Sequence, residues 1–74
     1  MPDMVNHPAH YNIPGRKECL DEMIDLFGLQ NTIIFCSMNS YKYRYRADLK
    51  GGQQDLQKAE WYDRKAAELM KRVI

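Results

Sequence analysis

Apolar residues recur with helical spacing over most of the chain. Between residues 17 and 27 they follow steps of one and three, and Gly28 comes next, where a left-handed residue commonly ends a helix. We therefore predict a helix over 17–27. Its apolar positions are Cys19, Leu20, Met23, Ile24 and Phe27, and its opposite, acidic face carries Glu18, Asp21, Glu22 and Asp25.

Two longer helices are predicted after this one. Asn31 is a suitable N-cap for a helix over 31–49, in which four apolar residues follow steps of four, three and four and form the expected core stripe: Ile34, Met38, Tyr41 and Tyr45. Gly51 and Gly52 then break the pattern. A further helix is expected over 53–72, and it should form a hairpin with the helix over 31–49. The inward positions of the 53–72 helix, close to heptad spacing, are Leu56, Ala59, Tyr62 or Asp63, Ala66, Leu69 and Val73.

The first fifteen residues contain all three prolines of the chain and predict an extended arm over 1–15 that lies across the helices. The expected fold is thus all-α, with residues 1–74 forming one small three-helix domain that includes the arm and the helical hairpin. A chain of 74 residues buries only a thin core. Because nothing in the sequence indicates a disulfide framework or a metal cluster, we expect a homo-oligomer.

Charge and apolar content narrow the class of protein. The formal net charge of +1 gives no overall attraction to nucleic acid or to an anionic membrane. The two cysteines, Cys19 and Cys36, lie in helical apolar patterns and are predicted to be buried, reduced thiols. No apolar run reaches the roughly 20 residues that span a bilayer, and the N-terminus lacks the apolar segment of a signal peptide. We therefore expect a cytoplasmic protein with no membrane partner.

A polar cluster around the glycine turn is the candidate ligand site. Arginine offers a planar fork to phosphate, lysine a point charge, asparagine both donors and an acceptor, and an acid orients the cations. The alternative is an ordinary solvated face with ion pairs along the helix. The residues of the cluster are Asn39, Lys42, Arg46, Lys50, Asp55 and Lys58; Tyr62 and two residues of the arm, His10 and Tyr11, are added as candidate contacts to a base or sugar.

Neither catalysis nor a resident metal can be assigned from these residues. His7 and His10 lie close together, but a closed zinc site needs two more ligands at suitable spacing. The acids of the first predicted helix are spaced to chelate magnesium, yet the next helix lacks a second acidic motif. No phosphate-binding loop and no recognisable nucleophile are present. Catalytic residues are therefore unknown, and magnesium is expected only as a companion of a bound nucleotide.

Four ordered motifs resemble one group of proteins. They read V-N-H-P-x-H-Y from Val5, E-C-L-D from Glu18, N-x-x-K-Y-x-x-R from Asn39 and D-L-x-K-A-x-W-Y from Asp55. The chain is similar in these motifs to the SaV-like family of small phage proteins. That family includes the nucleoside monophosphate kinase of a T-odd coliphage, which lacks a phosphate loop. The resemblance implies a helical phage protein with a family surface at Asn39, Lys42, Tyr43, Arg46, Asp55 and Lys58.

Two functions follow as hypotheses. In the first, the oligomer is a phage accessory protein in the host cytoplasm that binds a nucleotide or nucleotide signal by its phosphate, either as a sponge or with kinase-like turnover; binding without turnover is favoured. In the second, the chain is a small effector that binds and inhibits a host defence protein or another phage protein. The hot spots of such an effector would be Trp61, Tyr43, Tyr45 and Arg44.

Overall fold

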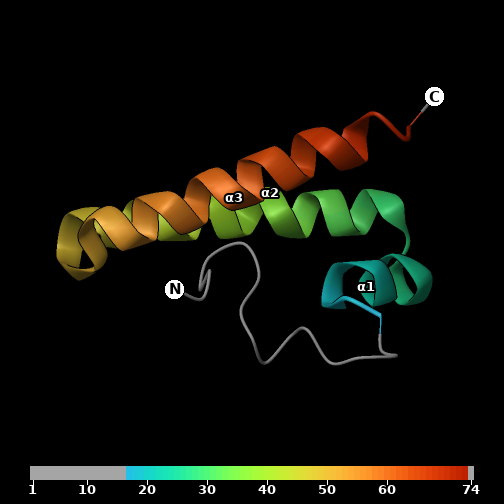
Figure 1. Cartoon of the computed structure of the whole chain (residues 1–74), viewed down its shortest axis with the longest axis horizontal. Helices are drawn as coiled ribbons and strands as arrows, with labels where there is room; N and C mark the ends of the chain where they lie inside the picture. The colour runs from blue at the N-terminus through green and yellow to red at the C-terminus, as the bar shows by residue number, and fades with distance from the viewer. Residues whose placement is uncertain (1–16, 74) are drawn as a thin grey trace.

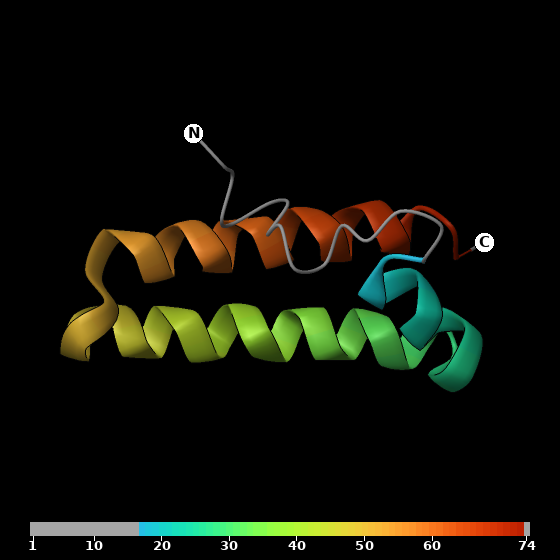
Figure 2. The same ribbon diagram turned by 60° about the horizontal axis from the view of Figure 1, so that its bottom comes forward.

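The chain is a short helix followed by a long helical hairpin (Figure 1). The computed structural model describes residues 17–73. Helix α1 spans Cys19–Phe27, α2 spans Leu29–Arg46, a π-helical turn η2 spans Ala47–Gly51, and α3 spans Gly52–Met70. Helices α2 and α3 lie side by side and antiparallel, and α1 crosses the end of α2 opposite the turn (Figures 1 and 2). The described residues contain no strand, which confirms the all-α class.

A single glycine separates α1 from α2. Gly28 has a φ of +91°, a conformation that favours glycine, and its N–H donates to the carbonyl oxygen of Ile24. The Gly28 carbonyl in turn accepts the Thr32 hydroxyl at 2.9 Å and the Thr32 N–H at 3.2 Å. Helix α2 therefore begins at Leu29, two residues before the expected Asn31 cap, because the glycine alone redirects the chain. The Asn31 side chain instead donates to the Phe27 carbonyl.

The hairpin is held together by small side chains. On α2 the buried residues are Thr32, Cys36 and Ser40, and on α3 they are Asp55, Ala59, Ala66 and Leu69. Side chains of this size let two helices approach closely. The core cluster of Cys36, Ala66 and Leu69 is completed by partly buried apolar residues, many of them on α1 and the first half of α2: Leu20, Ile24, Leu29, Ile33, Phe35 and Tyr62.

The expected core stripe of the second helix is wrong. Ile34, Met38, Tyr41 and Tyr45 are 53%, 66%, 74% and 64% exposed. The side of α2 that meets α3 carries threonine, cysteine and serine instead, and bulky side chains there would hold the helices apart. The Thr32 hydroxyl can be buried because it donates to the carbonyl oxygen of Gly28, the residue that precedes α2. The large apolar stripe consequently faces away from the hairpin.

Three further expectations differ from the structure. Cys36 is fully buried, as expected, but Cys19 is exposed because it begins α1 on the outer side. The regular α-helix α2 ends at Arg46 rather than at residue 49, and the backbone continues as the wider π-helical turn η2. Val73, expected inside, is exposed beyond the end of α3. The arm over 1–15, with His10 and Tyr11, lies outside the described residues. None of the helices in residues 17–73 combines the length and the apolar content that a membrane span requires.

Candidate functional site

The candidate site is centred on Tyr43, near the turn end of the hairpin. Tyr43 is half-buried on α2, and its ring stacks on that of Tyr62 from α3, with centroids 5.9 Å apart and planes 11° apart. Phe35 and Trp61 meet Tyr62 edge-on, at 6.1 Å and 4.9 Å between centroids. This aromatic packing fixes the position of Tyr43, because buried rings prefer offset-stacked and edge-to-face contacts.

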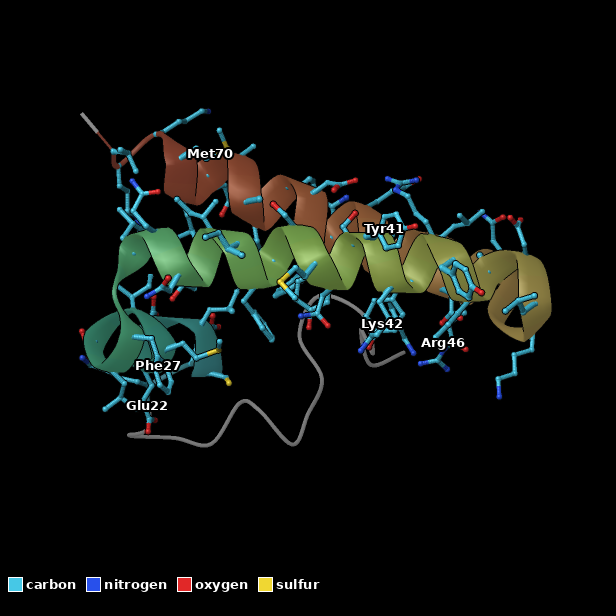
Figure 3. All side chains as sticks on the ribbon, turned by 180° about the vertical axis from the view of Figure 1, so that it is seen from behind. Glu22, Phe27, Tyr41, Lys42, Arg46 and Met70 are labelled. Atoms are coloured by element: carbon cyan, nitrogen blue, oxygen red, sulfur yellow. The ribbon has the colours of Figure 1, made fainter. Side chains whose placement is uncertain are left out.

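Three cations gather around the Tyr43 ring. Lys42 Nζ lies 4.7 Å from the ring centroid, Lys58 Nζ 5.4 Å and the Arg46 guanidinium carbon 5.6 Å. Lys42 and Arg46 are one turn apart on α2 and project from the same side of that helix (Figure 3), whereas Lys58 comes from α3. The electron-rich ring attracts all three charges. We call Lys42, Arg46 and Lys58 the cation cluster.

One buried carboxylate holds two members of the cation cluster. Asp55 is only 3% exposed, and its Oδ2 lies 3.6 Å from Arg46 Nε while its Oδ1 lies 4.0 Å from Lys58 Nζ. Both contacts are ion pairs without a hydrogen bond, and Arg46 Nε and Asp55 Oδ2 are buried with no hydrogen-bond partner. Buried polar atoms of that kind are rare and often mark functional positions.

The two glycines of the turn have different tasks. Gly52 has a φ of +56° and a ψ of −140°, which only glycine adopts without strain. Gly51 has ordinary helical angles, but a Cβ added there would lie 1.4 Å from Asp55 Oδ2 and 2.0 Å from its Cγ. Gly51 therefore provides the space in which the Asp55 carboxylate reaches Arg46.

The electrostatics of the cation cluster favour an anion. Three cations share one carboxylate, and Lys42 forms no ion pair with any residue in 17–73. Within residues 17–73 the cluster therefore has a net excess of about two positive charges over its one carboxylate. A phosphate monoester carries about −1.5 to −2 charges near neutral pH, which matches that excess. The π-helical turn beside the cluster is of a kind that is frequent at functional sites.

Not every expected ligand residue joins the cluster. Arg46, Asp55 and Lys58 meet directly, Lys42 joins them at the Tyr43 ring, and Tyr62 lies beneath that ring. Asn39 is separate, because its amide donates to the Phe35 carbonyl at 3.0 Å within α2. Lys50 is exposed on η2 and forms no ion pair among the described residues. His10 and Tyr11 lie outside those residues.

Sequence reasoning misses the roles of two residues in this site. Tyr43 enters the sequence predictions through the family resemblance and as a hot spot of the effector hypothesis, not in the ligand set, although it lies three residues before Arg46 on one helix. Gly51 is predicted only to break the helical pattern at the hairpin turn. A glycine pair signals a turn, but nothing in the sequence indicates that one of its members makes room for a particular carboxylate.

The surface expected for a protein-binding effector is divided in the structure. Tyr43 packs against Tyr62, whereas Tyr45, two residues later, projects from a different side of α2 and is exposed. Trp61 is half-buried between the Tyr62 ring and the Lys65 ammonium, 5.5 Å from its centroid. Arg44 donates to the Asp63 carboxylate. Tyr43 and Tyr45 therefore do not lie on one side of α2.

Asp63 is part of a second polar contact between the long helices. The Ser40 hydroxyl and then the Arg44 guanidinium hydrogen-bond to its carboxylate and lower the pKa of Asp63 below its ordinary value. Both hydrogen bonds favour the charged carboxylate. The contact links Ser40 and Arg44 of α2 to Asp63 of α3. It is a structural contact, separate from the cation cluster.

The acidic face of α1 does not assemble a metal site. Asp21, Glu22 and Asp25 are exposed, and Asp25 pairs with Lys17. The hydrogen bond to Asp25, and then the charge of that carboxylate, raise the pKa of Lys17 above its ordinary value. Within residues 17–73, no group of three or more histidine, cysteine, aspartate and glutamate side chains is arranged to hold a metal ion.

In a comparison with known protein families, residues 5–64 match DUF3310, a family described as a protein of unknown function. The chain belongs to the DUF3310 family. The match includes α2, the turn and the part of α3 up to residue 64, so Lys42, Arg46, Asp55 and Lys58 all lie in the DUF3310 region. No curated protein and no solved structure matches the chain. The DUF3310 family description names no activity.

Proposed function

We propose that the chain binds a nucleotide by its phosphate at the cation cluster. The observation that carries this proposal is the placement of Lys42, Arg46 and Lys58 within 6 Å of one ring, with a single buried carboxylate between them. Cations brought together in this way repel one another, and a phosphate relieves that repulsion. Asp55 holds Arg46 and Lys58 in place before the ligand arrives.

The base and sugar of the nucleotide need contacts beyond the cluster. The arm residues His10 and Tyr11 remain the candidates that the sequence gives for these contacts, and exposed Lys50 on η2 remains a candidate contact to phosphate. Asn39 is a weaker candidate, because its amide group is already engaged by Phe35. A magnesium ion would come with the nucleotide, bound by the phosphates. On the resemblance to SaV-like phage proteins we further propose an accessory role in an infected host cell, with binding favoured over phosphoryl transfer.

Binding of nucleoside monophosphates and triphosphates, measured by isothermal titration calorimetry with and without magnesium, tests the proposal. The informative variant is Lys42→Ala, because Lys42 has no ion pair in the described fold and its loss leaves the helix packing intact. The matched control is Lys71→Ala, which removes the same charge from the exposed far end of α3. Unphosphorylated nucleosides and inorganic phosphate separate recognition of the base from recognition of the anion.

We expect nucleotides to bind, nucleosides to bind poorly, and Lys42→Ala to weaken binding about three- to tenfold, as the loss of a partly screened charge contact predicts. Lys71→Ala should bind as the natural chain does. Equal weakening by both substitutions would mean that only the net charge of the chain matters, not the position of Lys42. Equal binding of nucleosides and nucleotides would show that the phosphate is not recognised. Consumption of a phosphate donor in the same samples would add turnover to binding.

A further inference from the structure

A long apolar stripe runs along the outer side of α2. Its residues are Ile34, Met38, Tyr41 and Tyr45, all more than half exposed, and exposed Leu49 on η2 continues it by another step of four. The steps of four, three and four are those of a coiled-coil seam, in which such residues insert between side chains of a facing helix. The seam has no facing helix within residues 17–73, because α3 packs on the opposite side of α2.

We infer that this seam binds the same seam of a second copy, with the two α2 helices antiparallel. The inference concerns a different surface from the cation cluster and does not depend on nucleotide binding. Identical seams are self-complementary, and a two-fold axis is the simplest way to satisfy both. The following observations favour a second copy over another partner and fix its direction.

Buried apolar side chains are few in the described hairpin: Cys36, Ala59, Ala66 and Leu69. The five residues of the seam are all more than half exposed. An added interface would supply the apolar burial that the hairpin lacks.

The direction follows from the distribution of charge along α2. Residues 29–39 carry no charge, whereas the last six residues of α2 include three cations, Lys42, Arg44 and Arg46, and no acid. Parallel copies would place these cationic ends together. Antiparallel copies place each cationic end beside the uncharged half of the other α2, and the helix dipoles are then opposed.

Helix α1 adds an attraction to the antiparallel arrangement. Seen from behind, α1 with Glu22 lies on the same side of α2 as Lys42 and Arg46, but at the opposite end (Figure 3). A two-fold axis perpendicular to α2 exchanges the ends and keeps that side common to both copies. The exposed acids of α1 in one copy, Asp21 and Glu22, therefore come near Lys42 and Arg46 of the other. The apolar seam is then flanked by opposite charges.

Sedimentation equilibrium of the full chain tests the inference. We expect a dimer at micromolar concentration, and a monomer for Met38→Glu, which places a charge in the centre of the seam. Met38 is 66% exposed in the single chain, so the variant should retain its helical circular dichroism. The matched control is Gln57→Glu, which adds the same charge at an exposed position of α3 and should remain dimeric.

Direction is tested by cross-linking in a Cys19→Ser background, where the remaining Cys36 is buried. In antiparallel seams Ile34 of one copy faces Tyr45 of the other. Mixed Ile34→Cys and Tyr45→Cys chains should therefore form an oxidised dimer that neither variant forms alone. Cross-linking of each variant with itself would show a parallel dimer and overturn the direction. A monomeric natural chain, or a Met38→Glu variant that stays dimeric, would overturn the inference.

Discussion

Replacing Gly51 by alanine should destabilise the chain even though Gly51 has helical backbone angles. At most helical positions the change from glycine to alanine stabilises a protein by about 0.5–1 kcal/mol, because the unfolded chain loses freedom. Here the new methyl group would lie 1.4, 2.0 and 2.7 Å from Oδ2, Cγ and Cβ of Asp55. Rotation of the carboxylate cannot relieve the contact with Cβ, so the backbone has to move as well.

The expected loss is the balance of three effects. Forcing a methyl group into filled space costs about 1–3 kcal/mol. Displacing Asp55 also breaks its ion pairs with Arg46 and Lys58, whose side chains are 43% and 32% exposed, and each such pair contributes about 0–1 kcal/mol. Against this stands the entropic gain of alanine. We expect the free energy of unfolding to fall by about 1–3 kcal/mol for Gly51→Ala.

A double-mutant cycle with Asp55→Gly separates the clash from other causes. All three close atoms belong to the Asp55 side chain, so Gly51→Ala in the Asp55→Gly background should be neutral or slightly stabilising. Gly52→Ala is the control: its cost comes from a φ of +56° and should be similar in both backgrounds. Urea unfolding followed by circular dichroism, at one protein concentration, gives each value. An equal cost of Gly51→Ala in both backgrounds would refute the reasoning.

Three further outcomes are expected. Ser40→Ala should raise the pKa of Asp63, since the Ser40 hydroxyl is the largest cause of its lowering. Because the pKa of Asp63 is lowered in the folded state, its carboxylate stabilises the fold at pH values above the ordinary pKa of 3.8, and this stabilisation is lost as the pH falls through the folded-state pKa. NMR titration of the Asp63 carboxyl measures that pKa, and an unchanged pKa in Ser40→Ala would contradict the role given to the Ser40 hydroxyl. Mass spectrometry after brief alkylation should find label on Cys19 but not on Cys36, whose thiol pKa is raised by burial, until the chain is unfolded; early label on Cys36 would show an open core. Leu69→Ala should lower the free energy of unfolding by about 2–4 kcal/mol in urea titration, and a loss below about 1 kcal/mol would mean that Leu69 is not a core residue.

Helical periodicity predicted the class of the fold and much of the site. The turn at Gly51 and Gly52, and the meeting of Arg46 with Asp55 and Lys58, follow from spacing alone, because a short link between two helices brings the residues beside it together. The helix ends differ by only a few residues from the expected ones. These features depend on the spacing of residues that are close together along the chain, and that spacing is read directly from the sequence.

The direction in which α2 faces could not be predicted in the same way. A stripe of isoleucine, methionine and tyrosine normally indicates a core, and here those residues are exposed while Thr32, Cys36 and Ser40 are buried. Burial of hydroxyl groups becomes tolerable only once their hydrogen-bond partners are known, and Ser40 finds its partner on the other long helix, at Asp63. The space that Gly51 leaves for Asp55 likewise depends on the folded geometry.

The two ends of the hairpin differ in what holds them. Near α1, the core of Cys36, Ala66 and Leu69 is sealed by surrounding apolar residues, whereas the turn end depends on ion pairs around Asp55. Segments with few apolar contacts open locally more often than the molecule unfolds as a whole. Amide hydrogens near the turn should therefore exchange with solvent sooner than those near Leu69. A ligand bound to the cation cluster would slow amide exchange near the turn but not near α1. Hydrogen exchange would therefore measure occupancy of the cation cluster without an added label.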